Sequence, residues 1–423
     1  MHRTIPRTST IGAMRTDAAA PSARSLRGLD ALTFLMADVR DGIGPYLSVF
    51  LKGSEHWSSG AIGIAMATSS IAAAVCQVPA GLLVDETRAK RLLIVASGLM
   101  VGAGCLLIVA YPHFLTVIAA QATLGLALAV IPPLFAALSL GLVGRRRLDA
   151  RISRNESFNH GGNFVAAGLA GMLGQYAGYD WIFYLVCAFA VASACIVTLI
   201  DPAEIDHERA RGGEGPGQEG EPMPFRELMR RRDLLVFLGS VVLFHFGNAA
   251  MLPMAGQVLA LRHPGSDTIA LSACIITAQF VMVGVAWAVG RASARGVGRK
   301  KIFLIALAVL PLRGVLFSFT TGPYGVVAIQ LLDGVAAGIF GVISVLVASD
   351  LMRGTGRFNL AQGLTALAVG LGATLSNATS GYVVQWFGYA TGFLYLAGIA
   401  LCALVFFALF MPETRTTDRE AAT

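Results

Sequence analysis

The chain contains twelve long apolar stretches, each close to the length of a membrane-crossing helix. A helix needs about 20 mostly apolar residues to cross the ~30 Å hydrocarbon layer of a bilayer. The predicted spans lie near residues 30–51, 58–84, 92–111, 114–143, 156–177, 181–200, 234–259, 268–290, 302–319, 323–350, 359–386 and 391–411. The short alternating segments that build an outer-membrane barrel are absent from the sequence. We therefore predict an all-α polytopic membrane protein with twelve transmembrane helices.

Composition excludes the main alternatives. The chain is 55% hydrophobic and only 13% charged, and its mean hydropathy is +0.68. Soluble domains carry about 25% charged residues, and single hydrophobic cores stop growing at about 250–300 residues. A chain of 423 residues with this composition is therefore neither a cytosolic enzyme nor a disordered protein.

Basic residues are distributed unevenly between the predicted spans. With twelve spans both termini lie on one side, and the tails and loops of that side hold 28 of the 32 lysines and arginines. Membrane proteins keep such residues on the cytoplasmic side, so we predict cytoplasmic termini and a bacterial inner-membrane location. The net charge of +7 is then a topology signal near anionic lipid, and we expect no nucleic-acid partner. Residues 1–28 lack a continuous apolar segment, so no cleaved signal peptide is expected.

Signatures of catalysis and of cofactor binding are absent from the sequence. There is no HExxH, no GxSxG and no complete phosphate-binding loop, so ATP-driven transport is not supported. Six cysteines lie inside predicted spans without a CxxC pair, and we interpret them as buried free thiols rather than disulfides or metal ligands. They are Cys76, Cys105, Cys187, Cys195, Cys274 and Cys402. We predict no catalytic residue, no metal site and no cofactor.

Aromatic residues mark the predicted outer ends of several spans. These residues are Trp57, Trp181, Trp386, Tyr111, Tyr179 and Tyr389. Tryptophan and tyrosine gather at membrane–water interfaces, where their rings are apolar and their polar atoms reach water. We interpret the six as an interfacial belt, with ligand stacking as the alternative.

One long polar segment, residues 201–233, divides the spans into six and six. Its Gly, Pro and Glu content predicts a flexible cytoplasmic linker. The predicted organisation is an N-terminal tail over 1–28, a six-helix bundle over 29–200, the linker over 201–233, a second six-helix bundle over 234–411 and a tail over 412–423.

The two halves contain similar segments at a constant spacing. QYAGYDWIFYL (Gln175–Leu185) matches QWFGYATGFLYL (Gln385–Leu396) at an offset of 210, and Gly171 falls on Gly381. Upstream, QATLGLALAV matches QLLDGVAAGI at an offset of 209. A parallel duplication of six-span units is the internal symmetry of one major class of transporters.

The loop between the second and third spans reads GLLVDETRAKR. Together with the twelve spans and the duplication, it resembles the G-x-x-x-D-x-x-G-R-[KR] loop of the major facilitator superfamily, and the resemblance covers nearly all of residues 29–411. The residues of this loop are Gly81, Asp85, Arg88, Lys90 and Arg91, of which Arg88 stands where the family has Gly. The resemblance implies two six-helix bundles that alternate between two faces, with this loop as a latch on cytoplasmic helix ends. A basic turn that only sets topology is the alternative.

Two other markers of the family are altered here. Proton-coupled members often carry Arg in the fourth span at the position of Gln121, with Gly125 following. Antiporters carry Gly-Pro in the fifth span, where this chain has GLAGMLG (Gly168–Gly174). Both departures count against proton antiport. Gln121 and its counterpart in the second half, Gln330, are kept as candidate cavity residues.

The first span contains the cluster LMADVRDGIGPY, with Asp38, Arg40 and Asp41. The two acids are three residues apart, roughly 60° around a helix, so they share one face, whereas Arg40 points elsewhere. An ionised group at bilayer depth costs about 3 kcal/mol or more and persists when paired or wetted. We favour a protonation site or cation contact at this cluster, and a fixed ion pair is the alternative.

Arg313 and Asp333 form a second buried pair of charges. They lie in the ninth and tenth spans, each roughly 13–16 Å from the outer boundary at 1.5 Å per residue. A short turn over 320–323 keeps these helix ends together. We predict a structural or gating ion pair, with direct substrate contact as the alternative.

Uncharged polar residues supply further candidates on spans that line the cavity in the resembled family. They are Asn159, His160, Asn163, His245, Asn248 and Asn377. An intramembrane His is either an interhelical hydrogen-bond partner or a contact for cargo or protons, since it titrates near neutral pH. Both readings stay open for each His.

We predict a monomeric secondary transporter in the lipid bilayer that moves a small organic solute by alternating access. Proton-coupled efflux of a drug-like compound or metabolite is the leading function. The alternative is an importer that takes up a nutrient, organic acid or siderophore-like compound by proton symport. The mixed charges of the spans do not decide the sign of the cargo. A membrane enzyme or lipid flippase would show a catalytic cluster, and a sensor would need a signalling domain larger than these tails.

Overall fold

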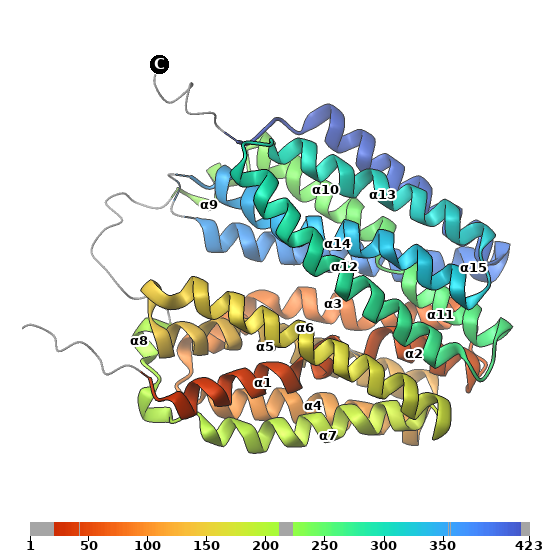
Figure 1. The fold of residues 1–423 in the computed structure, drawn as a ribbon, viewed down its shortest axis with the longest axis horizontal. Helices are drawn as coiled ribbons and strands as arrows, with labels where there is room; N and C mark the ends of the chain where they lie inside the picture. Colours follow the sequence, from red (N-terminus) through yellow and green to blue (C-terminus); the bar gives the residue numbers. More distant parts are fainter. Residues whose placement is uncertain (1–20, 42, 211–222, 354, 356, 416–423) are drawn as a thin grey trace, which may run out of the picture.

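The computed structural model describes residues 21–41, 43–210, 223–353, 355 and 357–415, and within these residues the regular structure is entirely helical. Figure 1 shows the long helices lying side by side in two groups, one above the other. The first group contains α1 (Ala23–Asp41), α2 (Ile43–Gly53), α3 (Ser59–Glu86), α4 (Lys90–Ala110), α5 (Phe114–Val143), α6 (Arg145–Tyr176) and α7 (Asp180–Ile196). The second contains α10 (Arg232–Asn248), α11 (Met251–Arg262), α12 (Asp267–Ala294), α13 (Arg299–Phe319), α14 (Pro323–Leu351) and α15 (Phe358–Phe410).

Short elements connect the two groups along the chain. They lie within the segment predicted to be a flexible linker and just before it. They are η1 (Val197–Leu199), η2 (Pro202–Glu204), α8 (His207–Ala210) and α9 (Phe225–Leu228). Residues 211–222 lie outside the described residues. We call the end of the molecule that carries α8 and α9 the linker end, and the opposite end the distal end (Figure 1).

Nine helical segments of the described chain are long and apolar enough to cross a membrane. In this count, α10 and α11 together form one segment. Helix α15 also counts as one segment, although it consists of two helices joined at Gly388. The α1–α2 pair and α6 lie beside them and occupy the places of the first and fifth predicted spans. For these two the membrane crossing stays a prediction, because charged and polar residues interrupt their apolar surface.

The start of α6 corrects one prediction. Residues 144–154 fall in the basic loop between the fourth and fifth predicted spans, but the helix begins at Arg145, about three turns before the predicted span. The apolar pattern that locates a span does not detect a polar extension of the same helix. This extension brings Arg151 against Asp30 of α1, where both side chains are buried and form an ion pair. Arg154 binds the same carboxylate at 2.7 Å.

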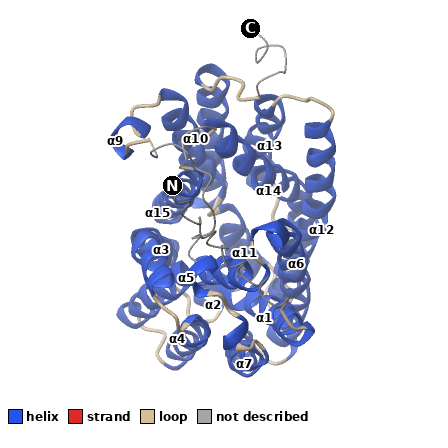
Figure 2. Ribbon diagram, turned by 90° about the vertical axis from the view of Figure 1, so that its left-hand side faces the viewer, coloured by secondary structure: helices blue, strands red, loops and turns tan. Residues whose placement is uncertain are grey.

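Corresponding helices of the two groups pack in corresponding pairs, as a duplication requires. In the first group α3 packs against α5 and α4 against α7, and in the second α12 packs against α14 and α13 against α15. Separate hydrophobic cores fill the two groups. The groups meet where α6 contacts α12, α3 contacts α15 and α2 contacts α11, and Figure 2 shows the first two contacts on opposite sides of the molecule.

Large apolar side chains also cover the outside of the molecule. Leu115, Phe280 and Trp287 have exposed fractions of 79%, 78% and 65%. Water-soluble monomers rarely expose apolar patches of more than a few hundred Å², so this surface is suited to lipid. All six cysteines are free thiols, as predicted, but the expectation that all six are buried is wrong, since only Cys105 and Cys274 are buried.

Gly388 joins the two helices of α15 with φ +83° and ψ 169°, a conformation that residues with a Cβ rarely adopt. We expect Gly388→Ala to lower the free energy of unfolding by about 1–3 kcal/mol because of this backbone strain. Thermal unfolding of the detergent-solubilised protein measures the effect. The control is Gly284→Ala, which lies in a helix with open space around its Cα. Equal shifts in the two variants would contradict the prediction.

Candidate functional site

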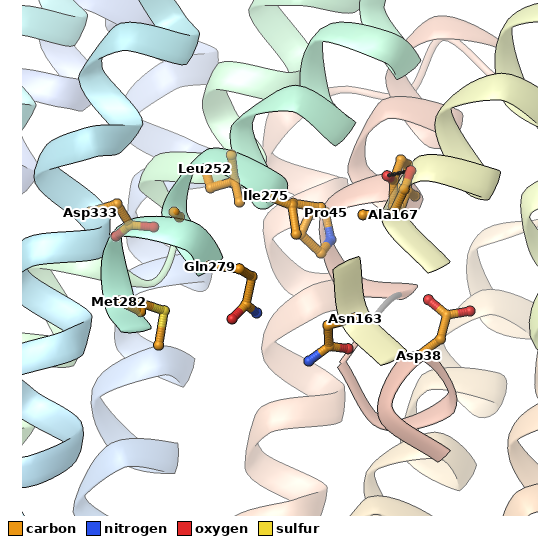
Figure 3. Close-up of a pocket in the computed structure, with 11 residues that line it drawn as sticks. Asp38, Pro45, Asn163, Ala167, Leu252, Ile275, Gln279, Met282 and Asp333 are labelled. Carbon is orange, nitrogen blue, oxygen red and sulfur yellow. Dashed lines mark hydrogen bonds between the residues drawn. The ribbon is translucent and has the colours of Figure 1, made fainter. Parts of the chain in front are cut away.

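A cavity of about 190 Å³ lies between the two groups of helices (Figure 3). Helices α1, α2 and α6 form one wall, and α11, α12 and α14 form the other. The lining residues are Asp38, Pro45, Tyr46, Asn163, Ala167, Leu252, Ile275, Ala278, Gln279, Met282 and Asp333. Most of this surface is apolar, and a few polar groups converge on it, which is typical of small-molecule binding sites.

Polar side chains reach the cavity from both groups. Figure 3 shows Asn163 of α6 and Gln279 of α12 in the central part, with Asp38 and Asp333 on opposite sides. Asp38 is nearly fully buried, with an exposed fraction of 4%. Three residues predicted from the sequence, Asp38, Asn163 and Asp333, are therefore brought together in one cavity although they lie on three helices.

The predicted ion pair between Arg313 and Asp333 is present, with 2.7 Å between the guanidinium Nη1 and the carboxylate Oδ1. The Arg313 side chain is only 1% exposed. It also donates to Asn248 Oδ1 and, at 2.8 Å, to Gln330 Oε1, and it lies over the ring of Phe317. Two predicted cavity residues, Asn248 and Gln330, thus hold the guanidinium behind Asp333, which itself lines the cavity.

The two histidines have different surroundings. His160 Nδ1 lies 2.8 Å from Gln279 Oε1, so it connects α6 of the first group with α12 of the second at the cavity. His245 packs against Phe244 and Phe340 inside the second group, and its Nε2 has no hydrogen-bond partner. The sequence left open whether each His makes an interhelical hydrogen bond. His160 makes one, whereas the buried Nε2 of His245 does not.

Arg40 and Asn159 lie in a different place from Asp38. The guanidinium Nη2 donates to Asn159 Oδ1 at 3.2 Å, and both residues line a side pocket of about 190 Å³ within the first group. Helices α1, α5 and α6 form this side pocket, which also contains Asn155 and Glu156.

Three other candidates are not placed in the cavity. Gln121 is buried in α5, and Asn377 Nδ2 donates to a carbonyl of its own helix, that of Ala373. Asp41 ends α1, but its side chain lies outside the described residues.

The predicted latch loop is mostly helical: Gly81 and Asp85 lie in α3, Lys90 and Arg91 lie in α4, and Arg88 lies in the tight turn between them. Asp85 and Arg88 are exposed, whereas Gly81 and Arg91 are partly covered. Lys90 is completely buried at the first position of α4, and its Nζ donates to the carbonyls of Val84 at 2.7 Å and Thr87 at 2.8 Å. These are carbonyls at the end of α3, so Lys90 caps the helix that precedes it. The latch role of this loop stays a prediction.

Hydrogen bonds join the two groups beyond the cavity, toward the distal end. The hydroxyl of Tyr46 lies 2.6 Å from that of Ser272, and Ser48 donates to the carbonyl of Pro253 at 3.1 Å. Gly63 of α3 lies so close to α15 that a Cβ there would approach the Asn377 carbonyl oxygen to 2.3 Å. These contacts close the distal end in this conformation.

Sequence reasoning missed two of the polar cavity residues, Tyr46 and Gln279. Both are uncharged and lie in apolar stretches, so neither stands out by the cost of its burial. It also missed the buried pair of Asp30 and Arg151. A helical repeat of four residues from Arg151 to Asn155, Asn159 and Asn163 would have pointed to this polar face of α6.

This fold and site define a polytopic helical membrane protein with a solute-sized cavity between two related halves. The family model described as Major Facilitator Superfamily matches residues 29–296 and 285–423. The chain belongs to the major facilitator superfamily, and it is a membrane transporter rather than an enzyme.

Similar proteins agree with this assignment. Two uncharacterized MFS-type transporters of Mycobacterium tuberculosis, from strains CDC 1551 / Oshkosh and H37Rv, are each 43% identical over 398 residues, which is 93% of this chain and 95% of theirs. The nucleoside transporter NupG has the same fold, with a TM-score of 0.76 and 14% identity over 92% of this chain and 100% of its own. A peptide transporter of the POT type has a TM-score of 0.73 and 13% identity over 92% and 94%.

Proposed function

We propose that the protein is a proton-coupled secondary transporter that exports a small organic solute, a drug-like compound or a metabolite, by alternating access. The observation that carries this proposal is the buried carboxylate of Asp38 in a cavity between the two halves. A cavity at the junction of two repeats is where secondary transporters bind their solute and coupling ion.

Asp38 is the residue we assign to the coupling. An ionised carboxylate is costly in a closed cavity at bilayer depth, and a neutral one is much less so. Protonation of the Asp38 carboxylate therefore lowers the free energy of the conformation in which the cavity is closed. In this way proton binding is linked to the change of conformation. Asp333 also lines the cavity, and its carboxylate is paired with Arg313 at 2.7 Å.

We propose that the linker end faces the cytoplasm of a bacterial cell, because the basic residues gather in the loops and tails on that side. The contacts at the distal end then close the cavity toward the outside. Alternating access for export begins with entry of the solute from the cytoplasmic side, which is the linker end in this proposal. A single chain contains the whole cavity, which supports a monomer as the working unit.

The test uses a bacterial host stripped of its own major pumps, grown on a broad panel of toxic compounds and siderophores. We expect resistance relative to the empty vector, and we expect inside-out vesicles with an acidic lumen to take up the same compounds. A protonophore, which collapses the proton gradient, is expected to abolish this uptake. Heightened sensitivity would contradict export and favour the alternative, a proton-symport importer. Transport that persists with protonophore would contradict proton coupling.

A further inference from the structure

The duplicated sequence motif lies at the distal end of both halves. Four of its shared positions are Gly171, Gln175, Gly178 and Tyr179 in the first half and Gly381, Gln385, Gly388 and Tyr389 in the second. The first set spans the turn from α6 to α7, and the second spans the corresponding joint inside α15. Gly178 and Gly388 both have positive φ, +107° and +83°, so both motifs end their first helix in the same way.

The first glycine of each motif lets a helix approach the opposite half closely. A Cβ on Gly171 would lie 2.3 Å from Ser272 Oγ of α12, and a Cβ on Gly381 would lie 2.6 Å from the carbonyl oxygen of Ser59 in α3. Contacts this short do not occur for real side chains. Only glycine at these two positions allows α6 to pack on α12 and α15 to pack on α3.

The glutamine and tyrosine of the first motif bind the start of α12. Gln175 Nε2 donates to the carbonyl of Gly265, and the Tyr179 hydroxyl donates to Asp267 Oδ2 at 2.5 Å. Burial and the neighbouring carboxylate raise the pKa of the Tyr179 phenol above its ordinary value, so the hydroxyl remains a donor. We call these two hydrogen bonds the first clasp.

The same residues of the second motif bind the start of α3. Gln385 Oε1 accepts from the backbone N–H of Gly60 at 3.1 Å. The Tyr389 hydroxyl lies 3.2 Å from the Ser59 hydroxyl, and it also donates to Gln257 Oε1 of its own half at 3.1 Å. We call the hydrogen bonds to Gly60 and Ser59 the second clasp. Helices α3 and α12 are themselves counterparts, each beginning at the distal end of its half. The two clasps are therefore related by the internal symmetry, and each connects one half with the other.

We propose that the duplicated motif is the distal gate of the transporter, in which each half closes on the other through the same glycine, glutamine and tyrosine. The inference deepens the proposed function and rests on its alternating access. Hydrogen bonds suit a gate, because water replaces their partners when the halves separate. The six-residue aromatic belt predicted above then has two members, Tyr179 and Tyr389, whose hydroxyls hold the halves together.

The experiment removes one hydroxyl from each clasp in the full chain, with Tyr179→Phe, Tyr389→Phe and the double variant. Spin labels placed at His113 and Thr321 report the distance between the halves at the distal end. Labels placed at Glu86 and Val297 report the distance between the halves at the linker end. These four residues are exposed and lie in turns or at helix ends of opposite halves. The six native cysteines are replaced with alanine in every sample, and no solute is added.

We expect each single variant to raise the ratio of distally open to distally closed molecules about fivefold, the effect of losing one hydrogen bond of about 1 kcal/mol. The double variant is expected to raise it about 25-fold on the same basis. The distance between the halves at the linker end is expected to shorten at the same time. A protein that is only less tightly packed would not show this shortening. Tyr111→Phe and Tyr324→Phe are matched controls, since both rings are exposed at the distal end, by 60% and 91%.

Two results would overturn the proposal: variants that shift no more than the controls, or distances that lengthen at both ends together. Failure of the proposed function looks different. A wild type that transports nothing, with a shifted double variant, contradicts proton-coupled transport and leaves the clasps supported. A transporting wild type with unshifted variants contradicts the clasps alone.

Discussion

Replacing Asp38 with asparagine is expected to lower proton-driven solute accumulation by at least about 100-fold, the lower range for removal of a positioned proton-transfer group. Asparagine keeps the size and the hydrogen-bonding capacity of the side chain but does not ionise. The variant should therefore fold, bind solute and exchange it across the membrane when no gradient is applied. Only the concentration of solute against its gradient should disappear.

Reconstituted liposomes separate these two activities, because counterflow measures exchange and an imposed pH gradient measures coupling. Glu156→Gln is the matched control, since it removes a carboxylate from the side pocket of the same half and not from the central cavity. Asp41→Asn is examined in parallel, because Asp41 belongs to the same predicted cluster. If Asp38→Asn still accumulates solute against a gradient, Asp38 is not the coupling site.

Replacing Asp333 with alanine is expected to destabilise the protein by about 3 kcal/mol, the cost of leaving one partner of a buried ion pair uncompensated. The cost arises at Arg313, whose side chain is 1% exposed. The amide oxygens of Asn248 and Gln330 remain as partners, but they carry no full charge. Removing both charges with Arg313→Met and Asp333→Leu together should restore much of the stability.

A double-mutant cycle on thermal unfolding measures the coupling between the two residues. The charge-swapped protein, Arg313→Asp with Asp333→Arg, tests the role of the pair in transport. We expect it to recover transport that either single neutralisation removes, provided that its unfolding temperature shows intact packing. Additive effects in the double-mutant cycle would mean that the two charges do not stabilise each other. If the charge-swapped protein is stable but does not transport, one of the two residues contacts the solute.

Much of the fold can be predicted from the sequence, because the bilayer makes the requirement local. A stretch of apolar residues long enough to cross the hydrocarbon layer identifies a helix without any knowledge of its neighbours. The pairing of Arg313 with Asp333 could also be predicted, because a short turn sets the relative depth of their two helices. The polar beginning of α6 could not, since Arg145–Asn155 has no apolar signature of its own.

The distinction between Asp38 and Arg40 required the structure. A helical repeat shows that the two side chains point in different directions, but not which helix lies in each direction. Packing places α6 and α12 so that Asp38 lines the cavity between the halves, and it places α5 beside Arg40 in the side pocket. The same limit applies to Tyr46 and Gln279, each of which has a hydrogen-bond partner in the opposite half.

The sequence by itself determined the membrane-spanning architecture, the duplication and the cost of every charge within the spans, because each depends on residue type and on spacing along one chain. Only the tertiary structure decided which of those charges meet in the cavity and what the duplicated motif does. The glutamines and tyrosines of the motif act on residues 88 to 330 positions away. Contacts of that kind are set by how two halves pack against each other, and no local pattern in either half encodes them.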